Sequence, residues 1–375
     1  MKTRAAILRA MGVAPPYADS RPLTIETVEL APPGPGEVLV RIKAAGLCHS
    51  DLSVIDGARP RPLPMALGHE AAGVVETLGP EVEDLAVGDH VVMVFMPSCG
   101  HCTPCAEGRP ALCEPGAVAN RNGELLRGGT RISLNGAPVH HHLGCSAFAE
   151  HAVVSRRSLV RIDRELSFED AALFGCAVLT GVGAVVNTAR VRPGETVAVV
   201  GLGGVGLASV LGAAAAGASQ VIAVDVSAEK LEIAARLGAT ATFDARDPDT
   251  AAKVREQTRG GVDYAIEMAG SIDALDAAVR MTRRGGATVT AGLPPPGRTL
   301  PLDIVGLVAE ERSVRGSYIG SCVPVRDLPA YVALYRAGRL PIDRLMSGAL
   351  TLDEINTGFD RLREGKAVRQ VVRFD

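Results

Sequence analysis

The chain has 375 residues, 47% of them hydrophobic and 22% charged, which is typical of a globular enzyme with two or three domains. Its net charge of −3 excludes a broad basic surface, so we expect neither a nucleic-acid partner nor binding to anionic membranes. No long apolar run follows the basic start MKTRAAILRAMG, and the most apolar stretch, residues 205–218, is too short and Gly-rich to span a bilayer. We therefore expect a soluble, cytoplasmic protein.

Two sequence textures divide the chain. Residues 1 to about 160 contain short strand patterns such as LTIETVEL and GEVLVRIKAAG, separated by breakers such as APPGPG, which predicts a partly open all-β barrel or sheet. From about Glu195 strand runs such as TVAVV and QVIAVD alternate with helical patterns such as AEKLEIAARLG, which predicts a parallel doubly wound sheet. After about residue 318 we expect a helix (LPAYVALYRAG) and a last strand (AVRQVVRF) that returns to the first domain.

Four of the eight cysteines lie within fifteen residues: Cys99, Cys102, Cys105 and Cys113. In a large chain without a secretion signal, such spacing favours thiolates on a metal over disulfides. Four thiolates close a tetrahedral shell around zinc and leave no open position, so this pattern predicts a structural zinc site. A redox cluster, an iron–sulfur cluster or unliganded thiols are the alternatives.

A glycine-rich loop follows the TVAVV strand and opens a helical pattern. It fits G-x-G-x-x-G, and Asp225 ends the next strand nineteen residues after the last glycine. The pattern predicts that the pyrophosphate of a dinucleotide lies at the helix N-terminus and that Asp225 binds the adenosine ribose hydroxyls. Because a carboxylate repels a 2′-phosphate, we expect NAD rather than NADP; the alternative is a structural turn. The motif residues are Gly201, Gly203, Gly204, Val205 and Gly206.

Three further candidate metal ligands, Cys48, His69 and Cys176, are far apart in the sequence. A set of two cysteines and one histidine leaves one coordination position open, as a catalytic zinc requires. No spacing rule links the three residues, so the residues alone leave a second interpretation open, in which the cysteines belong to the core and the histidine to the surface.

Taken in order, these segments resemble the zinc-dependent medium-chain alcohol dehydrogenases over almost the whole chain. The strings that carry the resemblance are GLCHSD, GHEAAG, the four-cysteine loop, FGCAVLTGVGAVVNTA and GLGGVGL. The similarity is strongest to the liver-type branch, which includes the glutathione-dependent formaldehyde dehydrogenases. It implies a GroES-like β-barrel catalytic domain over residues 1–177, a Rossmann NAD-binding domain over 178–318, and a return to the catalytic domain over 319–375.

The resemblance also implies the catalytic roles. Cys48, His69 and Cys176 correspond to the catalytic zinc ligands, and Glu70 to a carboxylate that approaches the metal during ligand exchange. Asp51 corresponds to the partner that orients His69. Ser50 corresponds to the hydroxyl that takes the alcohol proton. The implied reaction interconverts an alcohol and its aldehyde or ketone, and hydride passes from a zinc-bound alkoxide to the nicotinamide.

Further roles follow from the same resemblance. His49 and Arg369 correspond to residues that hold the cofactor pyrophosphate, and Lys230 to the lysine beside the ribose. The residues that correspond to the substrate pocket are Ser50, Arg59, Phe95, His142, Leu143 and Leu293. The cofactors implied are NAD and two zinc ions per chain, one catalytic and one structural. We also expect a homodimer, in which a strand-like segment over residues 294–305 pairs across a two-fold axis.

The chain departs from the liver-type branch at several positions. Ser53 stands where many members end the proton relay in a histidine, and Arg59 and His142 replace residues that are often apolar. Arg59 either clamps an anionic or polar substrate tail or points into water. Ala117 stands where glutathione-dependent members have an arginine, and ARPRPLPMA before the GHE motif is basic rather than acidic, which argues against glutathione-linked activity.

Two other functions remain open at this point. The same scaffold could act as a dismutase or reductase that recycles bound NAD. Alternatively, the chain could be a non-enzymatic nucleotide-binding scaffold with structural zinc only, although complete ligand sets at both metal positions argue against it. The sequence specifies neither the physiological alcohol nor the preferred direction.

Overall fold

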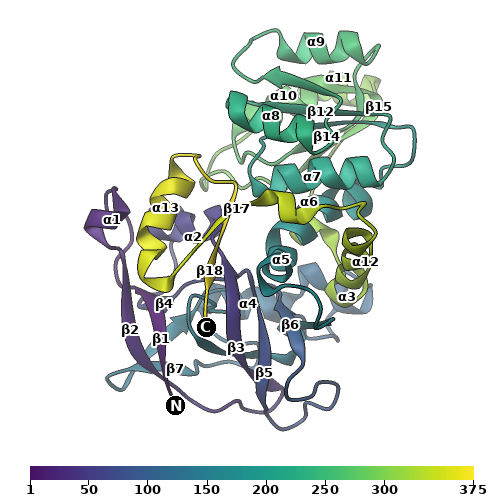
Figure 1. Cartoon of the computed structure of the whole chain (residues 1–375). Coiled ribbons are helices and arrows are strands. Elements are labelled where there is room, and N and C mark those ends of the chain that lie inside the picture. The colour runs from purple at the N-terminus through teal and green to yellow at the C-terminus, as the bar shows by residue number, and fades with distance from the viewer. The chain divides into compact units, whose positions relative to one another are not determined.

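The computed structural model describes all residues, 1–375, and its contacts divide the chain into two compact units (Figure 1). The first unit comprises Met1–Cys176, Val323–Pro329 and Met346–Asp375, and the second comprises Ala177–Cys322 and Ala330–Leu345. The expected return over residues 319–375 is therefore interrupted. The interruption has a local cause, because the hydroxyl of Tyr331 accepts a hydrogen bond from the Asn187 amide of the second unit at 3.3 Å.

The secondary structure follows in chain order. The strands are β1 (Lys2–Leu8), β2 (Leu23–Leu30), β3 (Glu37–Gly46), β4 (Met65–Ala66), β5 (Ala71–Leu78), β6 (His90–Met93), β7 (Ile132–Leu134), β8 (Ala137–His141), β9 (His151–Ser155), β10 (Leu159–Ile162), β11 (Thr196–Val200), β12 (Gln220–Asp225), β13 (Ala241–Asp244), β14 (Val262–Glu267), β15 (Thr282–Thr290), β16 (Ser313–Gly316), β17 (Met346–Leu350) and β18 (Arg369–Arg373). The α-helices are α1 (Tyr17–Ser20), α2 (His49–Ile55), α3 (Thr103–Ala106), α4 (Glu114–Asn122), α5 (Phe168–Leu173), α6 (Leu179–Gly183), α7 (Gly204–Ala215), α8 (Ala228–Arg236), α9 (Thr250–Gln257), α10 (Ile272–Met281), α11 (Ile304–Ala309), α12 (Pro324–Arg336) and α13 (Ile355–Arg363). The 3₁₀ helices are η1 (Pro110–Leu112), η2 (Arg156–Ser158), η5 (Ile319–Ser321), η6 (Ile342–Leu345) and η7 (Leu352–Glu354), and the π-helical segments are η3 (Phe174–Val178) and η4 (Ala184–Ala189).

The first unit contains a closed barrel and a second sheet. The barrel has the order β1-β2-β7-β8-β4, and its apolar interior includes Ile7, Val28 and Val139. The second sheet has seven strands: six in the order β10-β6-β5-β3-β18-β17, and β9 paired with β3. Because β3 pairs with three other strands, its sequence EVLVRIKAAG is buried along almost its whole length. The predicted β-rich region is confirmed, with a closed barrel in place of the partly open one.

The C-terminal strands complete the second sheet of the first unit. β18 pairs antiparallel with β3, with Val371 opposite Gly46, and β17 pairs parallel with β18 (Figure 1, yellow beside purple). This pairing brings residue 369, at the start of β18, to the end of β3. The last strand predicted from AVRQVVRF thus lies in the first unit.

The second unit is built on a six-stranded parallel sheet of order β13-β12-β11-β14-β15-β16. The apolar runs of β11 and β12 are buried, as expected for parallel strands covered on both faces. Strand order reverses between β11 and β14, and in open parallel sheets ligands bind at the carboxyl ends of the strands beside such a reversal. The predicted doubly wound fold is confirmed.

The segment over residues 294–305 is not a strand, so that expectation was wrong. Residues up to 303 are irregular, and helix α11 begins at Ile304. Three prolines and a glycine in Pro294-Pro295-Pro296-Gly297 explain this, since proline lacks the N–H that a strand ladder needs. The strand at the edge of the sheet is β16 instead.

One helical stretch, Phe168–Ala189, is long and apolar enough to cross a membrane, with a mean hydropathy of 1.7. It includes α5, α6 and both π-helical segments, and it is longer than the apolar stretch 205–218 considered from the sequence. In this structure 78% of its most apolar window is buried inside the protein, as in the core helix of a globular protein.

Candidate active site

Neighbouring strands deliver the scattered candidate ligands to one edge of the second sheet of the first unit. Cys48 follows the end of β3, and His69 and Glu70 precede the start of β5. Since β3 and β5 are antiparallel, with Ala45 opposite Ala71, the end of one strand meets the start of the other. The turn before His69 requires Gly68, whose φ is +95° and where an added Cβ would collide with the backbone of residues 147–148.

Cys176 reaches the same edge from the helix that follows β10. It lies in the π-helical segment Phe174–Val178, and π-helical turns are frequent at functional sites. Next to it, Gly175 packs so closely against the carbonyl of Met93 that a side chain there would overlap it. Met93 ends β6 opposite Ala71 of β5, so this close approach places Cys176 beside the residues that precede β5.

The four side chains Cys48, His69, Glu70 and Cys176 form a buried cluster in which one ligand atom of each lies within 4.8 Å of the others. The imidazole of His69 donates from Nδ1 to Asp51 Oδ1 at 3.0 Å, so in the neutral ring Nε2 carries the lone pair. This Nε2 is buried and has no hydrogen-bond partner. An unsatisfied buried polar atom costs roughly 1–3 kcal/mol, and zinc would satisfy it with donors that zinc prefers.

A buried arginine compensates the negative charge of this cluster. Arg369 Nη1 lies 3.3 Å from Glu70 Oε2 and donates to the carbonyl of Leu47 at 3.2 Å. Burial raises the pKa of Glu70 to about 7, and the arginine charge opposes this shift. The hydrogen bond from the Cys176 thiol lowers the pKa of Cys48, and the Arg369 charge lowers it further. One thiolate is therefore favoured at this site before any metal binds.

Asp51 lies next to His69 of the cluster, in the first turn of α2, and is fully buried. Its Oδ1 accepts hydrogen bonds from His69 and from the backbone N–H of Gly68 at 3.2 Å, and it lies 3.1 Å from His142 Nδ1. Burial by itself raises the pKa of Asp51, but the two histidines outweigh burial and lower it. Burial lowers the pKa of His142, which favours its neutral form. No sequence spacing predicted the contact between His142 and Asp51.

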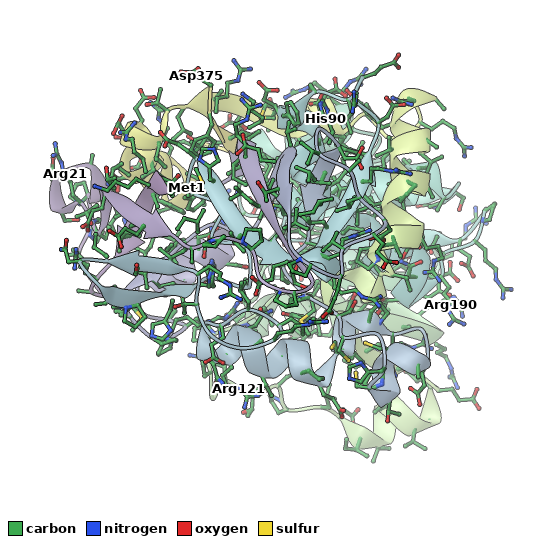
Figure 2. All side chains as sticks on the ribbon, turned by 90° about the horizontal axis from the view of Figure 1, so that it is seen from below. Met1, Arg21, His90, Arg121, Arg190 and Asp375 are labelled. Carbon is green, nitrogen blue, oxygen red and sulfur yellow. The ribbon has the colours of Figure 1, made fainter.

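The four-cysteine loop gathers as a second cluster, in which the four thiol sulfurs lie within 4.8 Å of one another. Sulfur atoms, drawn in yellow in Figure 2, gather beside the blue part of the ribbon. The Sγ atoms of Cys102 and Cys113 are 3.9 Å apart, which fits the separation of about 3.8 Å in a tetrahedral shell with Zn–S bonds of about 2.3 Å. None of the eight cysteines forms a disulfide, so no disulfide competes with metal binding.

Backbone N–H groups prepare the four-cysteine loop for a cation. Those of His101 and Cys102 donate to Cys99 Sγ at 3.5 and 3.3 Å, and those of Cys99 and Gly116 donate to Cys113 Sγ at 3.1 and 3.4 Å. Slight burial acts in the opposite direction, but these N–H groups lower the pKa of Cys99 to about 6. The loop thus stabilises the thiolate of Cys99, the form that binds zinc, whereas burial raises the pKa of Cys105 and raises that of Cys113 to about 12.

In the second unit, the glycine loop connects β11 to α7. An added Cβ at Gly206 would overlap the carbonyl oxygen of Gly201, so glycine is needed there for the helix to begin so close to the strand. No side chain caps the N-terminus of α7, which leaves its first N–H groups available to an anion. Asp225 Oδ2 accepts from the N–H of Leu202 at 2.6 Å, and Oδ1 accepts from Ser227 at 2.9 Å.

A cavity of about 430 Å³ opens beside Asp225 within the second unit. Gly201 and Asp225, both identified from the sequence, line it together with Asp247, Thr250 and Ser271, which sequence reasoning missed. The missed residues follow β13 and β14 in the chain. The sequence could have indicated these residues, because residues that directly follow parallel strands meet at the carboxyl edge of the sheet, where ligands bind.

The remaining predicted residues lie in different places. Phe95 and His142 flank the His69 ring edge-on, with ring centroids 5.4 and 5.5 Å away. Leu143 is buried in the same unit, whereas Leu293 belongs to the second unit and is 55% exposed. Ser53 donates to the carbonyl of His49 at 2.8 Å within α2.

Ser50, Arg59 and Lys230 are partly exposed, while His49 is exposed. Ser50 lies in the first turn of α2, two residues after Cys48. Arg59 follows that helix, and its backbone N–H donates to the carbonyl of Ser53 at 2.7 Å. Lys230 lies in the first turn of α8, where its backbone N–H donates to the Ser227 side chain at 3.4 Å.

Comparison with known proteins gives matches over both units. Residues 34–164 match the family model of the alcohol dehydrogenase GroES-like domain, and residues 204–337 match that of zinc-binding dehydrogenases. The chain is 38% identical to S-(hydroxymethyl)glutathione dehydrogenase of Escherichia coli O1:K1 / APEC over 378 aligned residues, which cover 100% of both chains. The chain belongs to the zinc-dependent medium-chain alcohol dehydrogenases.

Solved structures of this family share the whole fold. Benzyl alcohol dehydrogenase from Acinetobacter calcoaceticus is 33% identical and superposes with a TM-score of 0.93 over 100% of both chains. A zinc-binding dehydrogenase from Sinorhizobium meliloti 1021, bound to NADP, is 28% identical with a TM-score of 0.79, also over 100% of both chains. The resemblance inferred from the sequence is confirmed, and the chain is an oxidoreductase that acts on alcohols with a nicotinamide cofactor.

Proposed function

We propose that this member of the family is a cytoplasmic, NAD-linked dehydrogenase that interconverts a small-molecule alcohol and its aldehyde or ketone at Cys48, His69 and Cys176. The observation that carries this proposal is the convergence of two thiols and an imidazole on a buried point where His69 Nε2 lacks a hydrogen-bond partner. Three protein ligands leave a fourth position for substrate, as in catalytic zinc sites. The Cys99–Cys113 cluster, with four thiols, would hold a second, structural zinc ion.

The residues around the proposed metal have separate tasks. When bound, zinc would supply a Lewis acid for the alcohol oxygen, and NAD would supply the hydride acceptor. Ser50, two residues after Cys48, receives the alcohol proton at its Oγ. Asp51 fixes the tautomer of His69 so that Nε2 faces the metal position. Ser53 donates its own proton to the helix backbone, so we propose that the relay does not continue through it.

The proposed ligand role of Cys176 has a matched control in Cys145, another fully buried cysteine that is outside both clusters. Cys176→Ser should lose one zinc ion per chain and lower kcat/KM for alcohol oxidation by at least about 100-fold, because a hydroxyl is a poor zinc ligand. Cys145→Ser should keep both zinc ions and most of the activity. The measurements are metal analysis and NADH formation over a panel of alcohols. Full zinc content and activity in Cys176→Ser would exclude the proposed site.

We propose that the cofactor is NAD, bound in the second unit by the loop from Gly201 to Gly206, with Asp225 and Lys230 at the ribose. The carboxylate of Asp225 is held at the cavity wall by two backbone N–H groups. In that position it can accept hydrogen bonds from ribose hydroxyls and would repel a 2′-phosphate. Because a relative with the same fold was solved with NADP bound, the preference for NAD over NADP needs a direct test.

Asp225→Ser should narrow the ratio of kcat/KM with NAD to kcat/KM with NADP by roughly 10- to 100-fold, the scale of hydrogen bonds to a charged group. The control is Asp244→Ser. Asp244 ends the neighbouring strand in register with Asp225, but it is paired with Arg246 and does not line the cavity. An unchanged ratio in Asp225→Ser, or a preference of the unmodified protein for NADP, would contradict the assignment.

We propose a homodimer formed through the second unit. Its sheet ends in β16, whose outer edge has no neighbouring strand, and the adjacent helix α11 exposes apolar side chains. Val305 and Val308 are 79% and 71% exposed, which is unusual for a monomer surface. Light scattering at micromolar concentration should give twice the mass of one chain, and Val305→Asp should give monomers. Val87→Asp, at a 64% exposed valine of the first unit, should remain dimeric. A monomeric unmodified protein would refute the proposal.

A further inference from the structure

Asp51 is shared between two imidazoles, although the proposed metal site uses only one of them. His69 Nδ1 lies 3.0 Å and His142 Nδ1 lies 3.1 Å from the same oxygen, Asp51 Oδ1. The backbone N–H of Gly68 donates to this oxygen as well, at 3.2 Å. Asp51, His69 and His142 are all at most 1% exposed, so water does not compete for these contacts.

The second carboxylate oxygen of Asp51, Oδ2, does not help to hold the carboxylate in place. Oδ2 is buried and accepts no hydrogen bond. The carboxylate is therefore held through contacts at Oδ1 alone: hydrogen bonds from His69 and Gly68, and a close approach of His142 Nδ1 at 3.1 Å. With His142 absent, His69 and Gly68 would be the remaining donors, and they belong to adjacent residues of one segment. His142 makes the contact that approaches from another segment of the chain, immediately after β8, with its Nδ1 3.1 Å from Oδ1.

A comparison of the two rings that flank His69 separates packing from hydrogen bonding. Phe95 and His142 both contact the His69 ring edge-on, with interplanar angles of 89° and centroid distances of 5.4 and 5.5 Å. Either ring can restrict the His69 side chain by contact. Only His142 has a ring nitrogen within reach of Asp51.

We propose that His142 is a positioning residue for the metal ligand His69 and acts through Asp51. The polar contact of its Nδ1 with Oδ1, at 3.1 Å, holds the carboxylate, the carboxylate fixes the plane and tautomer of the His69 ring, and Nε2 is thereby held toward Cys48 and Cys176. This inference rests on the proposed metal site at these residues. Partners of ligand histidines influence metal affinity roughly 10- to 100-fold, so the effect is measurable.

The test compares two substitutions with opposite properties. His142→Phe keeps an aromatic ring against His69 and removes the N–H donor. His142→Asn removes the ring but places an amide N–H close to the position of Nδ1. We expect the zinc dissociation constant of the catalytic site, measured by competition with a chelator, to rise roughly 10- to 100-fold in His142→Phe. In His142→Asn it should stay within a few fold of the unmodified protein. If packing were the role of His142, the order would be reversed.

A spectrum and two further variants separate the positioning role from general destabilisation of the protein. The visible spectrum of the protein with cobalt at the catalytic site should change in His142→Phe and be largely restored in His142→Asn, because it reports ligand geometry directly. His140→Phe is the control, since this ring on β8 lies beside Gly123 instead and should leave affinity and spectrum unchanged. His142→Met removes the donor with a flexible side chain and replaces His142→Phe if that variant fails to fold.

The outcomes separate this inference from the proposed function. If the unmodified protein binds two zinc ions and His142→Phe binds zinc as tightly as His142→Asn, or more tightly, the positioning role is refuted while the active site stands. If the unmodified protein binds only one zinc ion, at the four-cysteine loop, the proposed active site fails and the inference fails with it.

Discussion

The first unit depends on one electrostatic constraint: two thiols, a carboxylate and an imidazole are buried together, so their negative charge has to be compensated inside the protein. Leaving charged or polar groups buried without partners costs several kcal/mol, so such a cluster persists only when it is compensated. Arg369 supplies one positive charge from β18, and the donor set is suited to zinc for the rest. The return of the C-terminal chain to β3 thus places a compensating charge beside the cluster as well as adding a strand to the sheet.

Strand register makes this cluster possible. The ends of β3 and β6 and the starts of β5 and β18 meet at one edge of a sheet, which brings together residues that are more than a hundred positions apart in the sequence. Each ligand comes from a strand end or a helix held by close backbone packing, and such positions are more rigid than free loops. The surrounding rings and Asp51 then restrict His69, which is the ligand with the most rotational freedom.

Local patterns in the sequence predicted much of this protein. The four-cysteine spacing, the glycine loop and Asp225 act within short segments, and the structure brings each set together as the spacing indicates. Alternating strands and helices predicted the parallel sheet for the same reason. Cys48, His69 and Cys176 could be assigned only by family resemblance, because their convergence depends on strand register that no local pattern encodes. The contact between His142 and Asp51 was missed, since it joins α2 to a segment after β8. Residues 294–305 were expected to form a strand-like segment that pairs across a two-fold axis, although their prolines prevent a strand.

The central claim is that two chemically different metal sites exist in one chain, and zinc-edge X-ray absorption combined with metal analysis tests it most directly. Because one ligand set contains four sulfurs and the other two, the account predicts two zinc ions per chain with an average of about three sulfur ligands each. The sulfur distance should be about 2.3 Å, with a nitrogen or oxygen shell at about 2.0–2.2 Å. One zinc ion per chain with four sulfur ligands and no nitrogen or oxygen shell would contradict the account.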